Sequence, residues 1–147
     1  MITVIATDDS ERQLKGLSYR QQKAFKRKQQ SITEQYPLLK ELQRKEITED
    51  GLEPDDMLKL REMEEELEEK VEPLMTEAIR MSLAKMDNEF AVPNLADGVT
   101  EEDIASAKEK AIEKIEDLFT LNQIKHLFQY SISGYIDAIS LKEINGR

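Results

Sequence analysis

The stretch PDDMLKLREMEEELEEKVEPLMTEAIRMSLAKM, residues 54–86, is the longest run of this sequence in which one apolar stripe lies beside a dense charged face. Its apolar residues recur at steps of three or four, which keeps them on one side of an α-helix. The stripe consists of Met57, Leu60, Met63, Leu67, Val71, Leu74, Ala78, Ile79, Ser82, Leu83 and Met86. Pro54 suits the first position of a helix, where its missing N–H is no loss. The stretch therefore predicts a long amphipathic helix around which the rest of the chain folds.

A proline interrupts this pattern at position 73. Proline removes a helical hydrogen bond and clashes with the preceding turn. The apolar spacing nevertheless continues in register from Val71 to Leu74 and Ala78. We therefore expect either one kinked helix or two helices that break near Glu72.

The N-terminal third gives weaker signals. Residues 1–7 are rich in β-branched side chains and favour an extended segment, but no convincing partner strand follows, so we expect an arm over residues 1–17. Leu14 and Leu17 stand at helical spacing and allow a short helical turn within it. The helical domain is then expected to cover residues 18–147.

Two helix boundaries are predicted in the next segment. Ser18 and Gln21 have the spacing of a capping box, and the helix that they begin should end or kink at Tyr36, before Pro37. The segment 45–51 is poor in apolar residues and contains Asp-Gly at its end, which predicts a turn.

The C-terminal half contains clearer signals. After a loop over residues 87–98, in which Phe90, Val92 and Leu95 could fold back onto the core, Thr100 precedes three acidic residues and predicts a helix start. Thr120 and Gln123 repeat the capping-box spacing, and the helix that follows should stop at Gly134. Residues 135–147 predict a short terminal helix.

Composition agrees with this helical pattern. The 147 residues fit one domain, and only five Gly and four Pro interrupt a chain rich in Glu, Lys and Leu. We therefore predict an all-α fold, a single-domain bundle of four to six helices with a short extended N-terminal arm. The chain has no cysteine, no signal sequence and no apolar run of about 20 residues, so we expect a cytoplasmic protein without a membrane anchor.

Charge is distributed in blocks that sum to −10. Residues 1–45 contain ten Lys or Arg against five Asp or Glu, residues 46–72 contain three against thirteen, and residues 73–147 contain eight against thirteen. A basic patch at Arg20, Lys23 and residues 26–28 could hold phosphates, but a helix that pairs with an acidic helix of the same or a neighbouring molecule is the favoured interpretation. A protein with a net negative charge repels polyanions, so we expect no nucleic-acid partner.

No pattern of catalytic or metal-binding residues occurs. His126 is the only histidine and has no acidic or cysteine neighbour at ligand spacing, and no nucleophile motif or glycine-rich phosphate loop is present. The glutamates of residues 64–69 fit a solvated helix face better than a calcium site. We therefore predict a protein that is not an enzyme and needs no cofactor or metal.

Methionine is concentrated on the long predicted helix, at positions 57, 63, 75, 81 and 86. Most of these side chains are expected to fill the core. A helix that is Met-rich on one face and Glu-rich on the other is also typical of a protein that holds the apolar helix of a partner while it stays soluble.

Three segments together resemble the tail assembly chaperones of long-tailed bacteriophages, a family of small, acidic, mostly helical proteins. They are the helix start LSYRQ (17–21), the segment AIRMSL (78–83) and the run IEDLFTLNQI (115–124), which continues to Leu127-Phe128 and Ser133-Gly134. The resemblance implies an assembly factor that coats the hydrophobic tape measure protein and helps to recruit tail tube subunits.

The resemblance and the apolar stripes together define the candidate partner-binding residues. These are Met57, Leu60, Met63, Leu67, Glu65, Glu66, Glu69, Leu121, Ile124, Leu127 and Phe128. The weakly charged segment 118–132 is expected to be the self-association surface of a possible homo-oligomer. Two other functions stay open: an acidic helical mimic of nucleic acid that inhibits a DNA- or RNA-binding protein, and a structural subunit of the phage particle.

Overall fold

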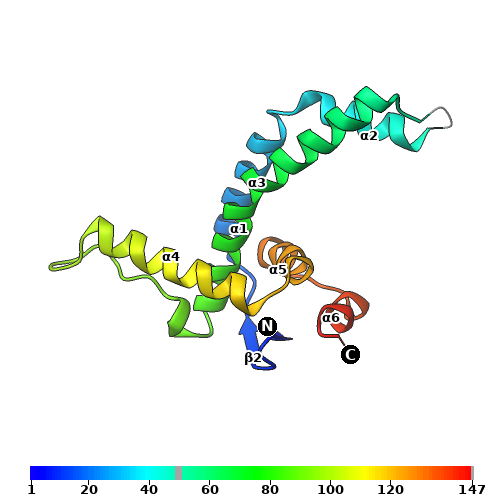
Figure 1. Cartoon of the computed structure of the whole chain (residues 1–147). Helices are drawn as coiled ribbons and strands as arrows, with labels where there is room; N and C mark the ends of the chain where they lie inside the picture. The colour runs from blue at the N-terminus through cyan, green and yellow to red at the C-terminus, as the bar shows by residue number, and fades with distance from the viewer. Residues whose placement is uncertain (49–50, 147) are drawn as a thin grey trace. The chain divides into compact units, whose positions relative to one another are not determined.

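The computed structural model describes residues 1–48 and 51–146. It is mostly helical, at 68% of the chain, and forms a single domain. Six α-helices, one short 3₁₀-helix and a two-stranded hairpin occur in the described part (Figure 1). The elements are β1 (Ile2–Ile5), β2 (Glu11–Leu14), α1 (Tyr19–Thr33), α2 (Pro37–Ile47), α3 (Pro54–Ala84), η1 (Asn88–Phe90), α4 (Glu101–Leu118), α5 (Leu121–Ser133) and α6 (Ala138–Ile144). The predicted helical fold class is confirmed.

The chain divides into two compact units. The terminal unit combines residues 1–25 with residues 75 onward, and the middle unit comprises residues 26–74. The long helix α3 is continuous through Pro73, so of the two expected arrangements the unbroken helix is the observed one. Helix α3 contributes its first part to the middle unit and its last turns to the terminal unit.

The capping signals formed as their spacing predicted. The Ser18 hydroxyl accepts the N–H of Gln21 at 3.3 Å, and the Gln21 side chain accepts the N–H of Ser18 at 3.1 Å. Thr120 and Gln123 make the same reciprocal pair at the start of α5. Gly134 ends α5 at φ +73°, a left-handed conformation that glycine adopts without strain. Local side-chain chemistry therefore sets these helix boundaries.

The other helix boundaries also follow the sequence closely. Thr100 and Asp103 form a capping box at the start of α4, and α6 supplies the expected terminal helix. Helix α1 ends at Thr33 and α2 begins at Pro37, as the proline requires. Helix α2 extends to Ile47, so the predicted turn was placed too early; Asp50 of that turn lies outside the described residues.

The N-terminal segment is extended, but the expectation of an arm without a partner strand is wrong. Strand β1 pairs antiparallel with β2, so that Ile2 lies opposite Leu14. The helical turn considered at Leu14 and Leu17 is also wrong, because Leu14 is the last residue of β2. The sequence of β2 is Glu-Arg-Gln-Leu, which has low intrinsic strand preference, so the pairing depends on contacts with the rest of the chain.

Those contacts join the hairpin to distant parts of the terminal unit. The Thr7 N–H donates to the Leu118 carbonyl at 2.8 Å, and the Leu17 N–H donates to the Ser131 carbonyl at 3.0 Å. Gly16 lies so close to Gly134 that a Cβ on Gly16 would stand 2.9 Å from the Gly134 Cα. The hairpin therefore packs directly against the α4 and α5 segments.

The core of the terminal unit is built from side chains of several elements. Its fully buried members include Val4, Leu14, Ile79, Leu83, Phe90, Ile115, Leu127 and Phe128. Phe90 folds back from the loop as expected, whereas Leu95 is exposed, so that part of the expectation is wrong.

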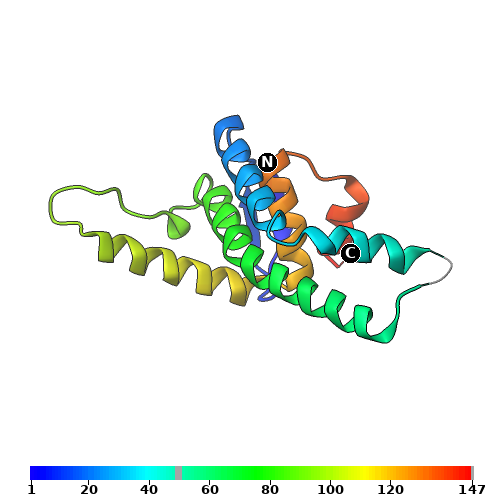
Figure 2. The same ribbon diagram turned by 90° about the horizontal axis from the view of Figure 1, so that it is seen from above.

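The middle unit is simpler. Helices α2 and α3 run antiparallel beside each other in both views (Figures 1 and 2). Tyr36, Leu39, Leu42 and Leu60 form their buried core. No helix in the described ranges is both long enough and apolar enough to cross a bilayer.

Candidate partner-binding surface

Several residues predicted to bind a partner are part of the two cores. Leu60 has no exposed area and belongs to the core of the middle unit, while Met63 and Leu67 pack against that core. Ile124, Leu127 and Phe128 are buried in the terminal unit. These side chains stabilise the fold, and a partner reaches them only if a unit opens.

The remaining predicted residues lie on the surface. Met57 and Leu121 are partly exposed, and the carboxylates of Glu65, Glu66 and Glu69 face solvent. The structure thus places Met57 and the three glutamates together on α3, in the middle unit, and Leu121 separately at the start of α5. Their role in binding stays a prediction.

The most exposed apolar side chains of the middle unit were not among the predicted residues. Ile47, at the last position of α2, is 86% exposed, and Leu58, in the second turn of α3, is 62% exposed. The sequence signal was weak, because Ile47 fell in a segment predicted as a turn and Leu58 lies off the apolar stripe. We call Ile47, Met57 and Leu58 the tip surface.

An ion pair brings the parts of the tip surface to one end of the α2–α3 pair. The Arg61 Nη2 atom lies 2.5 Å from Glu46 Oε1, and the Arg61 Nη1 atom lies 3.1 Å from Glu64 Oε2. Hydrogen bonding to Glu46, followed by its charge, raises the pKa of Arg61. Because Ile47 directly follows Glu46, the pair places the end of α2 next to the first turns of α3.

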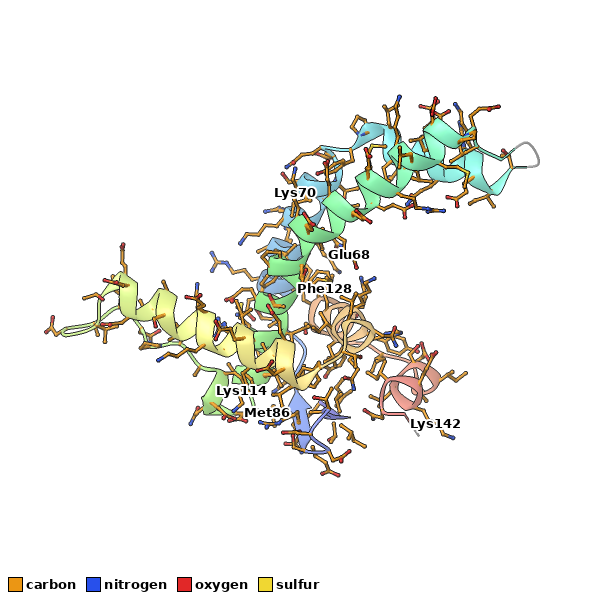
Figure 3. All side chains as sticks on the ribbon, viewed as in Figure 1. Glu68, Lys70, Met86, Lys114, Phe128 and Lys142 are labelled. Atoms are coloured by element: carbon orange, nitrogen blue, oxygen red, sulfur yellow. The ribbon has the colours of Figure 1, made fainter. Side chains whose placement is uncertain are left out.

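The other end of the α2–α3 pair is held by polar contacts at Tyr36. Its hydroxyl donates to Glu66 Oε2 at 3.2 Å, and the Lys70 ammonium lies 5.0 Å from the centroid of its ring. Lys70 also donates to the Gln35 side chain at 2.9 Å. Figure 3 labels Lys70 on α3. Together with the Arg61 pair, these contacts fix the register of α3 along α2.

The outward face of α3 carries a row of carboxylates. Glu62, Glu65 and Glu69 are exposed and follow one another at steps of three and four residues, which aligns them on one side of the helix. In the described part of the chain, none of the three has an ion-pair or hydrogen-bond partner. We call these three residues the acidic ridge.

The terminal unit has a charged cluster around η1. Arg12 Nη1 lies 3.2 Å from Glu89 and 3.7 Å from Asp87, and Lys114 pairs with Glu89. Figure 3 labels Lys114 on α4. Lys114 also lies 5.7 Å from the centroid of the Phe90 ring. These pairs join β2, η1 and α4, so we assign the cluster a structural role.

The buried side chain of Arg80 contacts the segment that contains η1. Its guanidinium pairs with Glu77 through two hydrogen bonds of 2.9 and 2.6 Å, and its Nη1 atom donates to the Phe90 carbonyl at 2.9 Å. A buried guanidinium is tolerated because these contacts compensate for the lost water. Arg80 therefore fixes the position of η1.

Two hollows occur on the described surface. One of about 310 Å³ is bounded by Gln30, Thr33, Glu34, Tyr36, Pro37 and Lys40, and one of about 430 Å³ lies where β1, α5 and the end of α6 meet. Within residues 1–48 and 51–146, no three His, Cys, Asp or Glu side chains are placed to hold a metal ion. His126 points its Nδ1 atom at the Asn122 carbonyl, 2.9 Å away on its own helix.

Comparisons with protein-family models, with curated proteins and with solved structures find no match to this chain.

Proposed function

We propose that the protein is a non-enzymatic tail assembly chaperone of a long-tailed bacteriophage, which binds the hydrophobic tape measure protein and helps to recruit tail tube subunits. The observation in its favour is the tip surface, where Ile47 and Leu58 expose most of their side chains to water. Apolar area that leaves water on binding contributes roughly 25 cal/mol per Å². An apolar helix of a client protein would gain this contribution by covering the tip.

The acidic ridge supports the same proposal in a different way. A chaperone that binds an insoluble client must keep the complex in solution. Glu62, Glu65 and Glu69 are on the same helix as Met57 and Leu58, and they face solvent. Like-signed charge on a complex opposes its association with other complexes. The ridge would therefore keep a client-loaded tip from aggregating.

Coexpression with a tape measure fragment from the same genome tests the proposal. The protein should raise the soluble fraction of the fragment several-fold, and the double variant Ile47→Ser, Leu58→Ser should lose most of that gain. The matched control Tyr135→Ser, Ile139→Ser removes two equally exposed apolar side chains from the terminal unit and should keep it. If the wild-type protein leaves the fragment insoluble, the proposal fails.

A second candidate function follows from the acidic ridge alone. Carboxylates at steps of three and four residues on a helix stand roughly 5 Å apart along its axis, a row of charge that resembles a nucleic-acid strand. A mimic of this kind would inhibit a DNA- or RNA-binding protein. Its binding to a basic partner should weaken by at least tenfold from about 50 to 500 mM salt. Affinity that survives high salt would exclude it.

Mass spectrometry of purified virions separates both candidates from a structural subunit. A chaperone or an inhibitor should be missing from the particle, whereas a subunit should be found at a constant copy number.

A further inference from the structure

Helix α1 has an exposed basic face, and three of its cations have no carboxylate partner in the described part of the chain. It contains five Lys or Arg and no Asp or Glu. Arg20, Lys23 and Arg27 are exposed, and none of them has a carboxylate within ion-pair distance. Positions i, i+3 and i+7 lie on one side of a helix, so the three cations form a single row. We call this row the basic ridge.

The basic ridge and the acidic ridge have the same spacing. Arg20, Lys23 and Arg27 are separated by three and four residues, and so are Glu62, Glu65 and Glu69. At a rise of 1.5 Å per residue, each row spans about 10 Å. The two rows match charge for charge when the helices lie parallel, with both N-termini at the same end.

A row that contains Glu66 in place of Glu65 is not equivalent to the acidic ridge. Glu62, Glu66 and Glu69 are spaced by four and three residues and would suit an antiparallel helix. Glu66, however, already accepts the hydrogen bond of the Tyr36 hydroxyl at 3.2 Å. The row of three carboxylates that have no partner is therefore the one that fits a parallel helix.

We propose that the basic ridge of one copy of this chain docks along the acidic ridge of a second copy. Arg20 then faces Glu62, Lys23 faces Glu65 and Arg27 faces Glu69. This self-association is independent of the proposed chaperone activity. It also places the interface on α1 and α3, whereas the segment 118–132 expected from the sequence has Leu118, Ile124, Leu127 and Phe128 buried in the core.

Charge favours a second copy over a nucleic acid as the occupant of the basic ridge. The chain has a net charge of −10 although α1 contributes five positive charges, so the remainder of the molecule is strongly acidic. Phosphate polyanions are repelled by that remainder. A second copy presents carboxylates in a matching row and brings them at the concentration of the protein itself.

Sedimentation velocity at several protein concentrations tests the interface. In about 20 mM salt the weight-average mass should rise with concentration above the 17.0 kDa of one chain. In about 500 mM salt, where charges are screened within a few ångströms, it should return to the mass of one chain. A wild-type protein that stays at 17.0 kDa in low salt at every concentration overturns the proposal.

Charge-swapped variants test the pairing itself. The triple variant Arg20→Glu, Lys23→Glu, Arg27→Glu and the triple variant Glu62→Lys, Glu65→Lys, Glu69→Lys should each sediment as a single chain. An equimolar mixture of the two should associate again, because it restores opposite charges across the interface. Circular dichroism checks that each variant is helical. If both variants fold but their mixture does not associate, the assigned pairing is wrong.

A matched control and a competing ligand complete the test. The variant Glu102→Lys, Glu109→Lys, Glu113→Lys changes three exposed carboxylates of α4 by the same total charge and should keep the association. A fluorescent single-stranded RNA serves as the polyanion probe in the same low-salt buffer. If the wild-type protein binds the RNA through the basic ridge and does not self-associate, the ridge is a nucleic-acid surface and the proposal is overturned.

Discussion

Each of the two units is stabilised internally by a different kind of contact. In the terminal unit, main-chain groups far apart in sequence bond to one another, as the Thr7 N–H does to the Leu118 carbonyl. In the middle unit, side chains make the polar contacts between the α2 and α3 segments, such as the Arg61 pair with Glu46 and the Tyr36 bond to Glu66. Buried main-chain bonds resist opening, whereas exposed ion pairs contribute little.

This difference predicts which unit opens first. The middle unit has a buried core of four side chains, while the terminal unit buries many more and includes an antiparallel hairpin. Regions with few buried apolar contacts open at lower free energy than the rest of a protein. The tip surface therefore lies on the unit that opens more readily.

The largest expected effect comes from the core of the terminal unit. Phe128→Ala removes a ring that is 1% exposed and should lower the free energy of unfolding by about 3–5 kcal/mol. Urea denaturation followed by circular dichroism measures the loss. Leu121→Ala, at a half-exposed position of the same helix, is the control and should change it by less than about 1 kcal/mol. Equal losses in the two variants would contradict the assigned core.

A smaller and more local effect is expected in the middle unit. Leu60→Ala leaves a cavity between α2 and α3 and should cost about 2–4 kcal/mol. Hydrogen exchange followed by mass spectrometry should show faster exchange in α2 while α5 keeps its protection. An equal loss of protection in α5 would show that the two units open together.

A smaller loss of stability is expected when the buried side-chain amide of Gln123 is removed from the terminal unit. Gln123 donates through Nε2 to the carbonyls of Ile5 and Ile144, at 2.9 and 2.8 Å, and accepts the N–H of Thr120. Gln123→Ala leaves these groups unpaired and should cost about 1–3 kcal/mol. Thermal unfolding measures it, with exposed Gln129→Ala as the control. A variant as stable as the control would mean that water replaces the amide.

The smallest effect concerns the start of α6. Hydrogen bonds from the Ser140 N–H and hydroxyl, at 2.7 and 2.9 Å, lower the pKa of Asp137. The ionised carboxylate therefore stabilises α6 at neutral pH, and this contribution is lost as the pH falls through the lowered pKa. Asp137→Ala should fray α6 at neutral pH and remove its dependence on acid, as read from ¹³Cα shifts of residues 138–144. Unchanged shifts in the variant would exclude this capping role.

The sequence predicted the helices because the signals that begin and end them are local. Ser18 with Gln21 and Thr120 with Gln123 bond across three residues, so their effect does not depend on the rest of the fold. Gly134 ends α5 through its own backbone freedom. The hairpin could not be predicted in this way, because β2 is polar and depends on packing against segments more than a hundred residues later.

The candidate site was predicted only in part for a similar reason. An apolar stripe identifies the residues that leave water, but it does not distinguish a core from a binding surface. Leu60 and Phe128 follow the helical spacing and are buried. Ile47 and Leu58 stand outside the stripe and remain in water. The matching of the two charged ridges, by contrast, can be read from the sequence once the exposed faces of α1 and α3 are known.

The packing of the N-terminal hairpin against α5 and the end of α6 sets an order for folding during synthesis on the ribosome. Strand β1 is synthesised well before Gln123 and Asn145, the side chains that cover its outer edge. Synthesis at 5–20 residues per second leaves β1 without them for on the order of ten seconds. The contacts between α2 and α3 lie within residues 26–74 and need none of the later chain. The middle unit, with its tip surface, can therefore form on the nascent chain before α5 and α6 cover β1.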